Sequence, residues 1–118
     1  VLVRRDTREK ITVSLDEIDA KVGELLETIQ KDMFERAKAH RDSHTHAALN
    51  WDEFKNIIDN EQGFVKAMWC GETACEEAIK DETGASTRCM PFAQEHLSDV
   101  CVHCGKPAKK MVYFGRAY

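Results

Sequence analysis

Two tight pairs of cysteines constrain the fold of this chain more than any other feature. They are Cys70 and Cys75, separated by four residues, and Cys101 and Cys104, separated by two residues. Thiolates at such spacings can surround one zinc ion tetrahedrally, and a shell closed by protein ligands leaves no position for a reactive water. The pattern therefore predicts a structural zinc site that organises the second half of the chain.

The second pair lies in the segment Cys101-Val102-His103-Cys104-Gly105-Lys106, which is typical of a zinc knuckle. Gly105 can adopt a positive φ, which lets backbone N–H groups approach the thiolate sulfurs. Four thiolates on one Zn²⁺ leave a local charge of about −2. Basic side chains nearby in the sequence are expected to offset it: His103, Lys106, Lys109 and Lys110.

Other uses of the cysteines fit the sequence less well. A disulfide framework is disfavoured because the chain has five cysteines, an odd number, and shows no signal-peptide pattern. A redox pair at Cys101 and Cys104 would normally open a helix, whereas Gly105 and Pro107 disfavour a helix here. Cys89 belongs to neither pair, and we expect it to be a small buried residue in a strand.

Composition limits the class of protein. With 42% hydrophobic and 32% charged residues in 118, the chain resembles a soluble globular domain, and no stretch approaches a membrane span of about 20 apolar residues. We therefore expect neither secretion nor a membrane partner, and a cytoplasmic location. The net charge of −4 argues against a protein that coats nucleic acid, although residues 101–118 carry basic side chains and no acidic one.

The first third of the chain predicts two short strands followed by one long helix. The strands cover residues 1–3 and 11–13, and they either form a hairpin or divide between two domains. Ser14 and Glu17 have the spacing of a capping box. From there an apolar residue recurs at steps of three and four, which predicts an amphipathic helix over residues 15–39 or beyond with many positions for a core.

Three histidines lie at the C-terminal end of this predicted helix. His40 and His44 have the i, i+4 spacing of metal ligands, but cationic side chains at a helix C-terminus are favoured by the helix dipole and usually face water. We favour the solvated interpretation for these two and for the neighbouring His46.

The remaining elements predict a small α+β fold. Asn50 is expected to cap a helix over residues 51–59, and later elements are a strand at 64–69, a helix at 72–81 ended by Gly84, and strands at 86–89 and 110–114. The order is β-α-α-β-α-β-knuckle-β. It indicates a small mixed sheet with helices on one face, plus the zinc knuckle.

Several motifs together resemble one known family. They are Trp69-Cys70-Gly71, the spacing of the four paired cysteines, the segment Gly84-Ala85-Ser86-Thr87-Arg88-Cys89-Met90-Pro91-Phe92, and the ending Tyr113-Phe114-Gly115-Arg116-Ala117-Tyr118. In this order they are similar to the C-terminal domain of prolyl-tRNA synthetase, of the archaeal- and eukaryote-like type that carries a zinc-binding extension. The resemblance covers essentially the whole chain.

The resemblance implies a division of the chain and a set of partners. Residues 1–7 would be the tail strand of a preceding anticodon-binding domain, and residues 8–118 the zinc-binding domain, with a fold similar to the C-terminal domain of bacterial translation initiation factor three. The partners would be the protein's own catalytic and anticodon-binding domains and, through them, tRNA(Pro). The parent would be a homodimer.

The resemblance also implies a ligase whose chemistry lies elsewhere. Such an enzyme activates proline with ATP and Mg²⁺ and transfers it to tRNA(Pro), using class II synthetase motifs that this sequence lacks. The segment also lacks a nucleophile-base motif, a phosphate-binding glycine loop and an HExxH zinc motif. We expect the segment to be inactive alone, to have no catalytic residue of its own, and to be a supporting part of the parent.

The end of the chain carries one further expectation. In the family, the terminal residue, here Tyr118, reaches the synthetic active site with its carboxylate. In the isolated segment we expect residues 116–118 to be disordered or bound by a neighbour, with Gly115 as a pivot. The alternative function is a free-standing zinc-binding interaction module of translation. The start at Val1, without Met, favours a fragment of a longer enzyme.

Overall fold

A computed structural model describes residues 1–117, which form two compact units, residues 1–40 and the part that starts at Arg41. In the first unit, β1 (Leu2–Val3) pairs antiparallel with β2 (Lys10–Ile11). The two runs therefore form a hairpin, the first of the two predicted alternatives. The assignment of residues 1–7 to a preceding domain stays a prediction.

An ion-pair network joins the hairpin to the long helix within this unit. The guanidinium of Arg4, only 8% exposed, donates to Asp6 at 2.9 Å and to Asp32 at 2.7 Å. Hydrogen bonds to Asp6 and Asp32 raise the pKa of Arg4, and the Arg4 contact lowers the pKa of Asp6. A buried guanidinium needs such partners, because leaving the charge unpaired out of water is costly.

The long helix begins later than predicted and differs in its packing. A short 3₁₀ helix covers Leu15–Glu17, and α1 runs from Ile18 to Ser43. The predicted capping box is wrong: the Ser14 hydroxyl donates to the Glu17 carboxylate at 2.7 Å instead of accepting from a backbone N–H. The expected core along the apolar stripe is also wrong for the described residues, since α1 has no buried residue.

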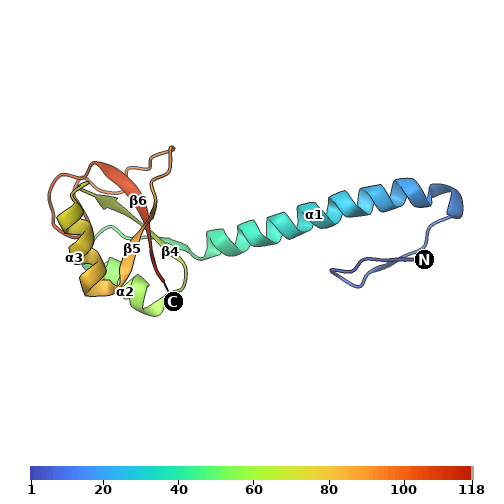
Figure 1. Cartoon of the computed structure of the whole chain (residues 1–118), viewed down its shortest axis with the longest axis horizontal. Helices are drawn as coiled ribbons and strands as arrows, with labels where there is room; N and C mark the ends of the chain where they lie inside the picture. Colours follow the sequence, from blue (N-terminus) through green and yellow to red (C-terminus); the bar gives the residue numbers. More distant parts are fainter. Residues whose placement is uncertain (118) are drawn as a thin grey trace. The chain divides into compact units, whose positions relative to one another are not determined.

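The second unit is built on a four-stranded mixed sheet of order β3-β4-β6-β5 (Figure 1). Its strands are β3 (Thr45–Ala47), β4 (Phe64–Trp69), β5 (Ala85–Cys89) and β6 (Lys110–Arg116). β3 is parallel to β4, and the other neighbours are antiparallel. The α+β class and the mixed sheet were therefore predicted correctly, whereas β3 was missed.

Helices α2 (Trp51–Asn60) and α3 (Thr73–Thr83) pack on this sheet and on each other, as Figure 1 shows. The Asn50 side chain accepts from the Glu53 backbone N–H at 3.0 Å, so the predicted N-cap is confirmed. Alternating residues of the strands and the apolar faces of the helices bury one core. It includes Phe54, Ile58, Val65, Ala67, Ile79, Val112 and Phe114.

Two expectations for individual residues of the strands were wrong. Cys89 belongs to β5 as predicted, but it is exposed, because it lies on an edge strand next to a register shift. Gly115 is not a pivot: it pairs with Ser86 inside β6, and its carbonyl accepts from the Arg88 guanidinium. Backbone pairing thus holds this position in the sheet.

Arg116 is likewise part of β6 rather than of a disordered tail. It pairs with Ala85, and its guanidinium donates to the Thr83 carbonyl at 2.7 Å and to Asp59 at 2.8 Å. The expectation for Tyr118 lies outside the described residues.

Gln94 extends the hydrogen bonding of the sheet where β5 stops. The last pair of β5 with β6 joins Cys89 to Tyr113. Beyond it, Pro91 has no N–H to donate. The Gln94 side chain instead accepts from the Met111 N–H at 2.7 Å and donates to the Met111 carbonyl at 3.2 Å.

We therefore expect Gln94→Ala to destabilise the second unit by about 0.5–1.5 kcal/mol per lost hydrogen bond. Gln94→Glu should cost at least as much, because its carboxylate can accept from the Met111 N–H but places a negative oxygen against the carbonyls of Pro91 and Met111. Urea unfolding followed by tryptophan fluorescence measures the difference, with the exposed Gln62→Ala as the matched control. Equal midpoints for Gln94→Ala and the control would show that this amide does not extend the sheet.

Candidate metal centre

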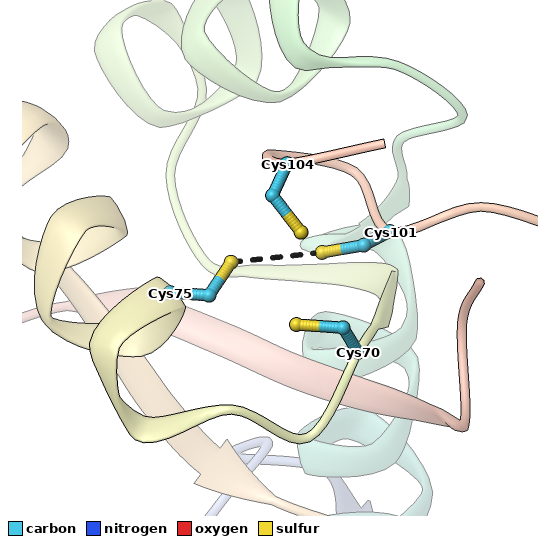
Figure 2. Close-up of side chains that lie close together, drawn as sticks. All are labelled: Cys70, Cys75, Cys101 and Cys104. Carbon is cyan, nitrogen blue, oxygen red and sulfur yellow. Dashed lines mark hydrogen bonds between the residues drawn. The ribbon is translucent and has the colours of Figure 1, made fainter. Parts of the chain in front are cut away.

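The four paired cysteines come from three elements that meet at one end of the sheet. Cys70 directly follows β4, Cys75 lies in the first turn of α3, and Cys101 and Cys104 lie in the loop before β6. Figure 2 shows their four side chains converging. Cys70, Cys75 and Cys101 are buried, whereas Cys104 is exposed.

The distances fit a tetrahedral metal ion. All four sulfur atoms lie within 4.8 Å of one another, and those of Cys75 and Cys101 are 3.7 Å apart (Figure 2). Zinc–sulfur bonds of about 2.3 Å imply sulfur–sulfur distances of about 3.8 Å around a tetrahedron. A disulfide needs about 2.05 Å, and all five cysteines are free thiols. The four cysteines could therefore hold a metal ion, and the set of donors is compatible with zinc.

Backbone hydrogen bonds hold the knuckle in position. The Cys101 N–H donates to the Lys106 carbonyl at 2.8 Å, and the Gly105 N–H donates to the Cys101 carbonyl at 3.2 Å. Gly105 has φ +68°, so the predicted positive φ is confirmed. The Val102 N–H donates to the carbonyl of Met68 in β4 at 2.9 Å. The knuckle is thus attached to the strand that delivers Cys70.

The environment acts differently on the individual thiols. Burial raises the pKa of Cys70 and of Cys75, and the neighbouring Cys101 adds to the effect at Cys75. Burial alone would also raise the pKa of Cys101, but backbone N–H groups, first those of Cys104 and His103, lower it to about 7. The knuckle therefore favours one thiolate, and a bound metal ion would displace the protons of the others.

Two basic side chains of the knuckle, those of Lys106 and His103, have acidic partners that the sequence did not predict. Lys106 contacts Glu72 at 2.6 Å, and this ion pair lowers the pKa of Glu72. His103 contacts Glu82 at 2.9 Å, which likewise lowers the pKa of Glu82. The two carboxylates lie at opposite ends of α3. They are far from the knuckle in sequence, so spacing alone gave no signal for these pairs.

The histidines at the end of α1 do not join the site. Within residues 1–117, the four cysteines are the one cluster of three or more His, Cys, Asp or Glu side chains that lie close enough together to bind a metal ion. The Nδ1 atom of His44 lies 3.0 Å from the Ser43 hydroxyl, and His46 belongs to β3. The solvated interpretation of His40 and His44 stays a prediction.

Fold and site together define a class: a small α+β domain with a mixed sheet and a four-cysteine group able to hold a metal ion. Residues 51–118 match the protein family described as "Prolyl-tRNA synthetase, C-terminal". This match covers more than half of the chain. The chain therefore belongs to that family.

Curated relatives match the chain over its whole length. The proline–tRNA ligase of Lachnospira eligens is 67% identical over 118 residues, that of Lachnoclostridium phytofermentans 65%, and that of Clostridium novyi 60%. In each case the match covers 100% of this chain and 25% of the relative. The chain thus spans about a quarter of the length of these ligases. Separately, no helix within residues 1–117 has the length and apolar character to cross a membrane.

Proposed function

We propose that this chain is the C-terminal supporting segment of a proline–tRNA ligase, and that Cys70, Cys75, Cys101 and Cys104 bind one structural zinc ion. The observation that carries the proposal is the convergence of the four sulfur atoms in a chain of this family. A closed shell of four thiolates has no open position for substrate or water. The zinc therefore supports the fold and takes no part in the reaction.

The zinc would join three parts of the second unit through its four ligands. Cys70 lies at the end of β4, and Cys75 lies at the start of α3. Cys101 and Cys104 lie in the knuckle, in the segment before β6. Three of these cysteines belong to the hydrophobic core itself. Binding of the metal is thereby coupled to formation of the core.

The chemistry of the ligase belongs to the rest of the protein. That part would bind ATP and Mg²⁺, activate proline as a class II aminoacyl-tRNA ligase, and transfer it to tRNA(Pro). The segment would brace the protein's own catalytic and anticodon-binding domains in a cytoplasmic homodimer. Relatives four times as long as this chain favour this proposal over a free-standing interaction module.

The finer parts of the proposal follow the sequence resemblance. The segment would be of the archaeal- and eukaryote-like type, similar in fold to the C-terminal domain of translation initiation factor three. Residues 1–7 would be the tail strand of the anticodon-binding domain. Tyr118 would support the reaction by placing its carboxylate in the synthetic active site.

Deletion of Tyr118 from the full-length ligase should therefore impair prolyl-adenylate formation more than affinity for tRNA(Pro). Proline-dependent ATP–pyrophosphate exchange and a tRNA binding titration measure the two effects. The 118-residue chain alone is the control and should catalyse no exchange, because it lacks the ATP-binding motifs. Exchange by the isolated chain would contradict the proposed division of labour, and unchanged exchange after the deletion would contradict the role of Tyr118.

A further inference from the structure

His103 contacts the four-cysteine group from outside, and three neighbours fix its ring. Its Nδ1 atom lies 3.5 Å from the Cys75 sulfur, and its Nε2 atom lies 2.9 Å from Glu82 Oε1. The ring also meets Trp51 edge to face, with 4.6 Å between centroids and 80° between planes. With a side chain that is 18% exposed, His103 has little freedom to point elsewhere.

The contact with Cys75 has a defined direction once a metal ion is bound. A metal-bound thiolate carries no proton, so the sulfur can only accept a hydrogen bond. The Nδ1 atom must then be the donor. Backbone N–H groups already serve the sulfur of Cys101. The buried sulfur of Cys75 instead faces a side chain, whose orientation depends on Glu82 and Trp51.

We propose that His103 is a positioning residue of the metal site: it donates from Nδ1 to the Cys75 thiolate, and Glu82 holds the ring in that orientation. The inference rests on the proposed zinc site. Hydrogen-bond partners of metal ligands orient the ligands, and their loss commonly weakens metal binding by about 10- to 100-fold. His103 therefore strengthens zinc binding without being a ligand.

Three substitutions separate the contacts of His103. His103→Asn keeps a donor near the position of Nδ1 and loses the contact with Glu82. His103→Gln keeps a polar group toward Glu82 and loses the donor to sulfur. His103→Phe keeps a ring against Trp51 and loses both polar contacts. His96→Asn is the matched control, because His96 pairs with Asp99 on the surface with a side chain that is 71% exposed.

The experiment measures the zinc affinity of the 118-residue chain by competition with a chromophoric chelator, and the absorption bands of its cobalt(II) form. We expect His103→Phe and His103→Gln to weaken zinc binding by about 10- to 100-fold and to shift the thiolate-to-cobalt bands. His103→Asn should bind more tightly than either, and His96→Asn should match the unsubstituted chain.

Several results would overturn the inference. Unchanged zinc affinity and cobalt spectra in all three variants would do so while leaving the zinc site itself intact. A loss of thermal stability with an unchanged cobalt spectrum would show that His103 serves packing alone. An unsubstituted chain that binds no zinc would refute both this inference and the proposed function.

Discussion

Removal of zinc from the 118-residue chain should unfold its second unit and leave much of its helical signal. Structural zinc contributes about 10–16 kcal/mol in zinc-finger peptides at neutral pH. The net stability of a whole domain is about 5–15 kcal/mol. The contribution of the metal is therefore as large as the whole net stability of a domain, and three of the cysteines are core residues, so we expect the core to be lost with the metal.

Two optical signals distinguish the units. Both tryptophans of the chain, Trp51 and Trp69, lie in the second unit, so their emission should shift to that of exposed indole when a chelator is added. The long helix α1, with 26 residues against 10 in α2 and 11 in α3, should preserve part of the far-ultraviolet circular dichroism.

Cys101→Ser should have the same effect as chelation, since it removes a buried ligand. Cys89→Ser is the matched control, because Cys89 is exposed and lies outside the four-cysteine group. It should leave the tryptophan emission and the response to chelator unchanged. Native emission in the Cys101→Ser chain, or after complete chelation, would show that the metal does not hold the fold.

Gly63→Ala should strongly destabilise the second unit. Gly63 has φ +114°, and a Cβ atom at this position would lie 1.9 Å from the backbone oxygen of His44. That oxygen also accepts from the Phe64 N–H at 2.8 Å, at the start of the pairing between β3 and β4. The clash is with backbone, so a side-chain rotation cannot relieve it.

The expected cost of Gly63→Ala is about 2–6 kcal/mol, combining strain at positive φ with overpacking. Urea unfolding of the zinc-loaded chain, followed by tryptophan emission, measures it. Gly23→Ala is a control of opposite sign, followed by far-ultraviolet circular dichroism because Gly23 lies in α1, in the first unit, and both tryptophans lie in the second. No atom lies within 4 Å of its added Cβ, and alanine favours a helix by about 1 kcal/mol. A Gly63→Ala chain as stable as the unsubstituted one would contradict the close approach of His44.

Local signals in the sequence predicted most of the second unit correctly. Asn50 caps α2 because its side chain meets an N–H three residues ahead, and Gly84 ends α3 with φ +72°. The spacing within each cysteine pair likewise predicted that the two sulfur atoms of that pair would lie close together. In each case neighbours in sequence determine the geometry.

Features that depend on distant partners were not predictable in this way. The strand β3 has only three residues, and it forms because β4 offers a parallel edge to it. The partners Glu72 and Glu82 reach the knuckle only through the placement of α3. The apolar stripe of α1 has helical periodicity, but periodicity does not say what covers a helix face.

The measurement that tests the central claim most directly is the metal content of the freshly purified chain, by native mass spectrometry with elemental analysis, together with its count of reactive thiols. We predict one zinc ion per chain and a single rapidly reactive thiol, that of Cys89. A chain free of metal, in which all five cysteines react, would contradict the account.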